Sequence, residues 1–276
     1  MKSTLSKYKK FIVAALLLIC LLPQSAIAQR KSPSNLPNYD NQPYHFGFIL
    51  GFNQMSFNVD YVKDYQSIAY SSDQSNNSWD ENWHDGYTYY VAGVASVPSP
   101  GFSVGIVGNL RLGKYFDLRL TPTLSFGRRD LQYYMYSDSL VNSPKTDNGF
   151  YLIKSTNAMW DAVIIELPLN VKYKSKRFNN FAAYVIGGAN FRFDATGRKN
   201  TNKSDENQII KVKTKLFDIA AEIGAGVDFY NSYFKFGIEL KMGWGLLNVL
   251  DKENQILDSS FDRLRNNTFQ ISLTFE

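Results

Sequence analysis

The chain has 276 residues, with 30 Lys and Arg against 25 Asp and Glu, and a single cysteine, Cys20. Four of the basic residues and Cys20 fall within residues 1–28, so the rest of the chain carries 26 basic against 25 acidic residues and no thiol. This near-neutral balance argues against a nucleic-acid partner, and the lack of further cysteines excludes a disulfide-stapled fold.

Residues 1–28 have the layout of a secretory signal peptide. Basic residues precede an apolar run from Phe11 to Leu22, and small residues follow it. The run has only twelve residues, whereas a membrane-spanning helix needs about 20. We therefore expect cleavage between Ala28 and Gln29, which releases the chain into an exported compartment.

Residues 29–43 contain three prolines and are expected to form an irregular periplasmic lead-in before a single domain, 44–276. Within that domain, apolar residues recur at every second position almost everywhere, whereas the 3.6-residue period of helices is nearly absent. No run of 18 apolar residues occurs, which excludes helical membrane spans. The pattern predicts an all-β protein.

Eight alternating segments of about ten residues or more are long enough for tilted strands to cross a bilayer. In chain order they are 44–53, 101–113, 116–126, a segment ending at Tyr173, 181–194, 218–229, 234–245 and 266–276. The fifth is apolar on both faces at its start, so its register stays open, and one option places Asn190 and Arg192 with the polar set. In DIAAEIGAGVDFYNSYFKFGIELKMGWG, residues 218–245, charged residues occupy many positions between the apolar ones.

The connections between these segments alternate in length. Short ones are expected near 113–115, 174–180 and 230–233, and long ones near 54–100, 137–158, 195–213 and 246–266. Such alternation is typical of a sheet whose tight turns all lie at one end. The alternating faces alone would also fit a soluble β-sandwich, but the export signal, the loop lengths, the rings near strand ends and the terminal strand favour lipid outside.

The sequence therefore predicts an eight-stranded antiparallel transmembrane β-barrel of the outer-membrane type, with four long extracellular loops and short periplasmic turns. A sheet in lipid must close on itself, and eight strands leave an interior that side chains fill, whereas porins need about 16. The inward positions carry six basic and six acidic residues, which we expect to form an ion network: Arg111, Asp117, Arg119, Glu166, Lys172, Arg192, Asp218, Glu222, Asp228, Lys235, Glu239 and Lys241.

Several segments resemble the PorT (SprT) family, outer-membrane β-barrel components of the type IX secretion system of Gram-negative gliding and gingipain-secreting bacteria. The segments are PYHFGFILGFN, IELPLNVKY, EIGAGVDFY, FKFGIELKMGWGLLNVL and TFQISLTFE. The resemblance implies an integral outer-membrane protein with an accessory or assembly role in protein secretion, other secretion components as partners, and no enzymatic activity. The alternative is a structural, adhesion or anchoring barrel of the same architecture.

Two histidines are the main candidates for site chemistry. His45 leads into the first strand and is interpreted as a turn residue, while His84 lies in SWDENWHDG among three acidic residues. A helical turn there could hold a divalent cation, but a polar surface loop is the simpler interpretation. No nucleophile accompanies either histidine, so we expect no catalysis, metal, cofactor or small-molecule substrate. In the same loop, Trp79 and Trp83 are better candidates for a partner contact.

Overall fold

A computed structural model of the chain describes residues 34–71, 88–137, 151–196, 213–252 and 258–276. The chain divides into two compact units, Met1–Ser34 and Asn35–Glu276, and the elements described below belong to the second. The expected cleavage site at Ala28 and the loop residues Trp79, Trp83 and His84 lie outside the described residues. No helix in the described ranges is long and apolar enough to cross a membrane.

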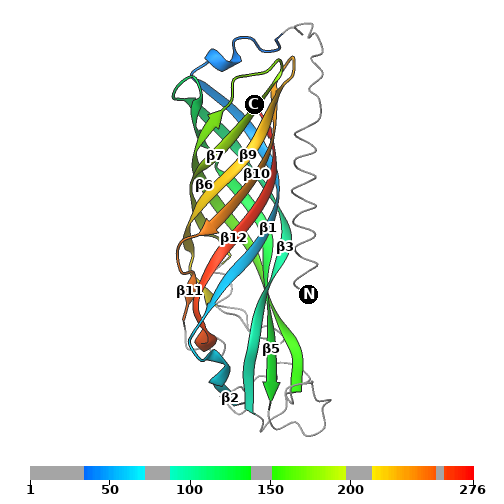
Figure 1. Ribbon diagram of the computed structural model, residues 1–276, viewed down its shortest axis with the longest axis vertical. Helices are drawn as coiled ribbons and strands as arrows, with labels where there is room; N and C mark the ends of the chain where they lie inside the picture. Colours follow the sequence, from blue (N-terminus) through cyan, green and yellow to red (C-terminus); the bar gives the residue numbers. More distant parts are fainter. Residues whose placement is uncertain (1–33, 72–87, 138–150, 197–212, 253–257) are drawn as a thin grey trace, which may run out of the picture. The chain divides into compact units, whose positions relative to one another are not determined.

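The second unit is a closed antiparallel barrel (Figure 1). Its wall is built from β1 (Tyr44–Tyr61), β3 (Thr88–Arg111), β4 (Phe116–Leu120), β5 (Thr123–Ser137), β6 (Tyr151–Lys174), β7 (Phe181–Asp194), β9 (Phe217–Tyr230), β10 (Lys235–Gly245) and β12 (Phe261–Phe275). Because β4 and β5 follow one another between β3 and β6, they act as one strand, and the ring has eight strands. The ring closes where β1 pairs with both β3 and β12, which confirms the predicted eight-stranded barrel.

Minor elements lie in the connections and at the start of the unit. They are β2 (Ala69–Ser71), β8 (Lys213–Thr214), β11 (Leu250–Asp251), and the 3-10 helices η1 (Tyr39–Asn41), η2 (Tyr65–Ser67) and η5 (Asp258–Ser260). β2 pairs with the outer part of β3, and β8 with β11.

Pro122 separates β4 from β5 because proline has no amide hydrogen to donate to the ladder. The surrounding hydrogen bonds bridge the break: Ile106 N donates to Pro122 O at 3.0 Å, and Thr121 N donates to Pro168 O at 3.2 Å. The wall is therefore continuous across this position.

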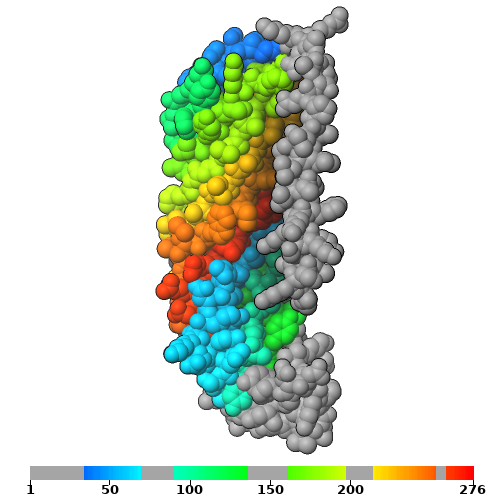
Figure 2. All heavy atoms as spheres, in the orientation of Figure 1, coloured from blue at the N-terminus to red at the C-terminus, as the bar shows by residue number. Residues whose placement is uncertain are grey.

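Alternation along the strands sorts apolar from polar side chains. In β10, Ile238, Leu240 and Met242 face outward with 41–49 % of their surface exposed, whereas Glu239 and Lys241 face inward with at most 6 % exposed. Figure 2 shows the side chains of β9, β10 and β12, in yellow to red, following the wall as diagonal bands. This apolar outer wall is the surface that a barrel presents to lipid.

The register of residues 181–194, left open by the sequence, is settled by the same criterion. Tyr184, Ile186, Asn190 and Arg192 are buried inside the barrel, while Val185 and the other odd-numbered side chains face outward. The option that groups Asn190 and Arg192 with the polar set is therefore correct.

Two of the expected long loops are partly strand. β1 continues to Tyr61, β3 already begins at Thr88, and β6 begins at Tyr151, so the expectation of loops was wrong for residues 54–61, 88–100 and 151–158. The extra strand lengths run on past the lower end of the barrel wall in Figure 1 and enclose a core of their own. This outer extension buries Phe57, Val91, Leu131, Tyr133, Met135, Val249, Leu250, Phe261 and Leu264.

The polarity of the alternation reverses where the outer extension begins. In β1, Phe48 and Phe52 point outward within the wall, but beyond them Asn58 points outward and Met55 and Phe57 point inward. A polar-out, apolar-in strand is the pattern of a water-soluble sheet, so the reversal marks the passage from lipid to water. The sequence prediction sought one polarity throughout and therefore stopped the strands too early.

The short turns all lie at the opposite end of the barrel. They join β3 to β4, β6 to β7 and β9 to β10, and the same end holds Pro43 and Glu276, since Arg111 N donates to Pro43 O and Lys235 N to Glu276 O. Because outer-membrane barrels keep their short turns in the periplasm, we call this the periplasmic end.

Candidate functional site: the barrel interior and its periplasmic mouth

Charged side chains from facing strands meet inside the barrel in three groups along its length. Alternation turns them inward, and glycines on the same face leave them room. At Gly226, for example, an added Cβ would lie 2.5 Å from the ring of Tyr184. The inward side chains therefore pack across the interior instead of standing apart around an open lumen.

The group nearest the periplasmic end is centred on Arg119 and Glu239. Arg119 Nη1 lies 2.7 Å from Glu239 Oε2, and both side chains are at most 2 % exposed. The hydroxyl of Tyr184 donates to the same Glu239 oxygen at 2.9 Å. Glu276 approaches from the last strand, with its Oε1 3.8 Å from Arg119 Nη2.

Two lysines complete this group. Lys172 Nζ lies 2.7 Å from Asp228 Oδ2 and 3.6 Å from the centroid of the Tyr184 ring. Lys235 Nζ lies 2.9 Å from Glu276 Oε2 and 3.8 Å from Asp228 Oδ2. Each charge therefore faces an opposite charge at a depth where solvent cannot screen it.

The middle group surrounds Glu222. Lys241 Nζ lies 3.1 Å and Arg192 Nη2 lies 3.8 Å from its carboxylate oxygens. Asn190 donates to Glu222 at 2.7 Å and to Glu166 at 2.6 Å, so one amide links the two carboxylates. These side chains come from β6, β7, β9 and β10, which ties four strands together.

The outer group is centred on Arg129, which pairs with Asp194 and donates to Asn266 Oδ1 at 2.8 Å. Asn266 in turn donates to Asp218 at 2.9 Å. The guanidinium also lies 5.0 Å from the ring of Phe57, in the core of the outer extension. This group therefore joins the polar interior of the wall to the apolar core beyond it.

The structure places eleven of the twelve predicted network residues in the buried interior. Asp117 is among them and pairs with Lys174 at 3.1 Å. Arg111 is different: it is only partly buried at the periplasmic rim and donates to the backbone oxygen of Gly113 at 3.1 Å. Its place at the last position of β3, beside a turn, explains why it stays outside the network.

Three further members were not in the predicted network: Arg129, Asp194 and Glu276. All three could have been recognised from the alternation of inward and outward positions along their strands. Arg129 lies on an inward position just past the expected segment 116–126, Asp194 is the last residue of the expected segment 181–194, and Glu276 follows the inward Ser272 and Thr274. With Glu276, whose side chain has no exposed surface, six buried cations face eight buried anions in the described part of the chain, and Lys174 at the rim adds a cation beside Asp117.

A short segment before the first strand lies across the periplasmic end, and we call residues 35–42 the mouth strap. Tyr39 stacks on His45 with a centroid distance of 3.8 Å, and its hydroxyl reaches Glu276 at 3.4 Å. Burial raises the pKa of the Tyr39 hydroxyl, so it remains a proton donor to that carboxylate. His45, expected to be a turn residue, is half-buried under this ring and belongs to the closure.

The strap is also held by the periplasmic turn between β6 and β7. Asp40 accepts a hydrogen bond from the Tyr230 hydroxyl at 3.0 Å and pairs with Arg177 at 3.7 Å. Asn35 N donates to Asn180 Oδ1 at 2.9 Å, and the Arg177 guanidinium lies 3.8 Å from the Tyr230 ring. Strap and network together fill and cover the periplasmic half of the barrel.

The interior groups carry ion pairs and not a metal-binding set. Within the described ranges, no group of three or more His, Cys, Asp or Glu side chains is placed to hold a metal ion. The arrangement can hold the strands in one register, because each interior pair bridges different strands. Among the described residues, the charged side chains that point into the barrel are buried against one another.

Comparison with known proteins identifies the family. The model of a family described as an outer membrane protein beta-barrel domain matches residues 27–251. The chain belongs to this family. Together with the closed ring and the apolar wall, this membership makes the chain an integral outer-membrane β-barrel protein, as the sequence predicted.

Other comparisons add little to this outer membrane beta-barrel domain assignment. No curated protein matches the sequence. Among solved structures, the chain is similar to the crystal structure of outer membrane protease OmpT from Escherichia coli, with 7 % identity, 84 % of this chain and 94 % of that chain covered, and a TM-score of 0.26. So low a score indicates no close agreement between the two structures.

Proposed function

We propose that the protein is an integral outer-membrane component that the type IX secretion system requires, and that it acts through protein contacts and not as the pore. Two things support this proposal: the resemblance of several segments to the PorT (SprT) family, and the filled interior. Those segments form β10, the inner parts of β1, β6 and β9, and the closing half of β12. They are thus parts of the barrel wall itself.

The observation that carries the mechanism is the burial of the interior charges. Arg119 and Lys172 are each 1 % exposed, and Glu239 is 2 % exposed, although all three lie within the membrane-spanning wall. To open a passage for cargo, these pairs would have to separate and leave several unpaired charges in a low-dielectric interior. A role through the outer wall, the periplasmic turns or the outer extension requires no such change.

The proposed role is not catalytic, and its proposed partners are other secretion components and the surrounding lipid. His45 has its ring stacked on Tyr39 within the mouth closure. The outer extension offers a rigid surface on the cell exterior, because its core holds Leu131, Tyr133 and Phe261 with no exposed surface. The periplasmic turns offer a second surface, where Tyr233 is 92 % exposed.

Deletion of the gene tests the secretion role. The expected result is that cargo proteins accumulate in the periplasm and that a plasmid copy of the wild-type gene restores their appearance at the cell surface. A second plasmid should carry a variant with photo-crosslinking residues at Tyr233 and, separately, at exposed Arg263 of the outer extension, to show which surface contacts a secretion component. If cargo reached the surface at wild-type levels in the deletion strain, the secretion role would be wrong. A loss of surface attachment alone would favour the adhesion or anchoring alternative.

A further inference from the structure

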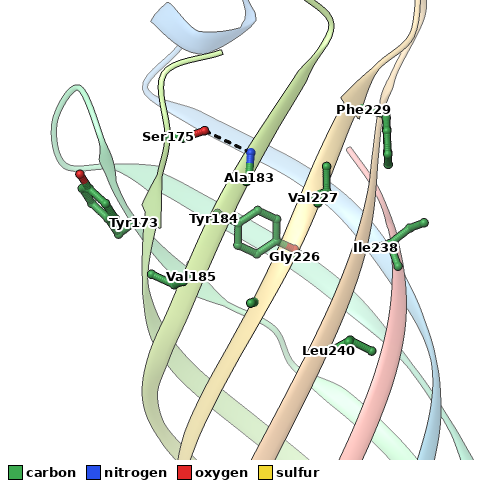
Figure 3. A pocket seen from close by; sticks show the side chains of 11 residues that line it. Tyr173, Ser175, Ala183, Tyr184, Val185, Gly226, Val227, Phe229, Ile238 and Leu240 are labelled. Carbon is green, nitrogen blue, oxygen red and sulfur yellow. Dashed lines mark hydrogen bonds between the residues drawn. The ribbon is translucent and has the colours of Figure 1, made fainter. Parts of the chain in front are cut away.

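An apolar groove lies on the outer wall near the periplasmic end, where β7, β9 and β10 pass side by side (Figure 3). Its volume is about 740 Å³, within the range of roughly 300–1,000 Å³ typical of small-molecule sites. The side chains that line it include Tyr173, Ala183, Val185, Ala225, Phe229 and Leu240. The groove opens on the lipid-facing surface, and Tyr184, whose hydroxyl donates to Glu239 in the interior, also borders it.

Two alanines on neighbouring strands create the hollow. Val185 lies opposite Ala225, and Ala183 lies opposite Val227, so the two alanines sit on a diagonal between β7 and β9. Tyr173, Phe229 and Leu240 stand around them with 41–49 % of their surfaces exposed. Small residues between large ones leave a depression that a flexible hydrocarbon chain can fill with close contact.

The groove reaches the level of the headgroups at its periplasmic end. Ser175, in the turn after β6, lines it there and accepts a hydrogen bond from Ala183 N at 3.2 Å. The ring of Tyr173 lies beside this turn, and rings of this kind are enriched at membrane interfaces. The surface of the groove is almost entirely apolar, as contact with a hydrocarbon chain requires, and the Ser175 hydroxyl lies in the turn at one end of it.

The turn also supplies an unpaired cation. Lys174 and Arg177 both lie within 4 Å of Asp40 in the mouth strap, so their charges are already matched. Lys176, directly after Ser175, is exposed and has no ion pair with any residue that the structure describes. A free ammonium group at the headgroup level attracts a lipid phosphate.

We propose that this wall groove is a phospholipid site: one acyl chain of a phospholipid from the periplasmic leaflet lies over Ala183 and Ala225, and Lys176 binds its phosphate. The site holds this lipid more tightly than the rest of the wall does, because the hollow gives the chain more protein contact than a level wall and Lys176 matches the charge of the phosphate. This proposal does not depend on the secretion role.

Native mass spectrometry of the full-length exported protein tests the site. The protein is released from detergent after incubation with dioleoyl-phosphatidylethanolamine or with dioleoylglycerol, which has the same chains and no phosphate. Wild-type protein is expected to retain a single phosphatidylethanolamine and markedly less dioleoylglycerol. Ala225→Leu fills the hollow and is expected to reduce retention of both lipids several-fold. Lys176→Gln is expected to remove the preference for the phospholipid while dioleoylglycerol retention stays unchanged.

Two matched variants serve as controls. Ala221→Leu adds the same side chain on the outward face of β9 but outside the groove, and Lys114→Gln removes an exposed lysine from the turn between β3 and β4. Both are expected to behave as wild type, and the heat-modifiable gel mobility of all variants reports whether the barrel is folded. Equal retention by the Ala225→Leu and Ala221→Leu proteins, or no retention by wild type, would overturn the site. A co-purifying protein that only Ala225→Leu releases would instead assign the groove to a protein partner.

Discussion

At the scale of single residues, the buried charges decide how the barrel tolerates substitution. Arg119, Glu239 and the Tyr184 hydroxyl form one connected set, in which both donors reach the same carboxylate oxygen of Glu239. Moving charges out of water is costly, and only close pairing offsets that cost. Removing one partner therefore destabilises the fold more than replacing both partners with apolar residues would.

We expect Arg119→Met to lower the free energy of unfolding by about 3–5 kcal/mol, because it leaves Glu239 buried without its cation. Urea unfolding in lipid vesicles, followed by tryptophan fluorescence, measures the change. Arg128→Met is the matched control, since Arg128 pairs with Asp161 at 3.3 Å on the surface, where the two side chains are 48 % and 84 % exposed. A surface pair of this kind contributes about 0–1 kcal/mol. Equal losses in the two variants would contradict the buried-pair account.

Glycine at position 226 has a different role, which is to leave room for a neighbouring ring. A Cβ there would lie 2.5 Å from Tyr184, so Gly226→Ala must push the ring away from Glu239. We expect a loss of about 1–3 kcal/mol, measured by the same urea titration. Gly93→Ala is the control, because no atom lies within 4 Å of the Cβ position at Gly93. Equal stability of the Gly226→Ala and Gly93→Ala proteins would show that Tyr184 can move without loss.

At the scale of single strands, the main feature is that apolar side chains point outward in the wall and inward in the outer extension. β5 repeats what β1 shows: Leu124 and Phe126 face outward in the wall, whereas Leu131 and Tyr133 face inward in the outer extension. One continuous strand thus serves two solvents, and the point of reversal locates the outer membrane surface on the chain. β12 reverses in the same way between Ile271 and Leu264.

This reversal also explains what the sequence could and could not predict. Within the wall, every second residue is apolar over ten positions, and the strands, their order and eleven of the twelve interior charges followed from that period. Past the wall the alternation continues, but the apolar residues now occupy the inward positions. Phe57 therefore fell in an expected loop, and Leu131 fell beyond the end of an expected strand. The contacts between interior charges depend on the stagger of strands around the ring, which period alone does not fix.

The core of the outer extension gives a prediction at this scale. Leu131 has no exposed surface, and Leu131→Ala is expected to destabilise the extension by about 2–5 kcal/mol while the barrel wall stays intact. Hydrogen exchange should rise in the outer part of β3, residues 91–98, and stay low in its inner part, residues 102–110. Val104→Ala, on the lipid-facing side of β3 and 42 % exposed, is expected to change neither. Faster exchange throughout β3 would mean that wall and extension unfold as one unit.

At the scale of the whole molecule, a filled interior predicts that the barrel does not conduct ions. In planar bilayers the purified protein is expected to give no stable conductance steps, because three groups of ion pairs occupy the interior from end to end. A 16-stranded porin recorded under the same conditions provides the positive control. Regular steps from the wild-type protein would contradict the closed interior and, with it, the argument for a role outside the lumen.

The meeting of β1 with β12 has a consequence for biogenesis. Their ladder joins Phe48 to Phe275 and Val59 to Leu264, so residues more than two hundred positions apart must find each other. Until the fifteen residues of β12 have been synthesised, the sheet has two edge strands with unpaired backbone groups. Each of these edges can pair with the wrong strand. Passage through the periplasm must therefore be chaperoned, and insertion has to wait for a finished polypeptide.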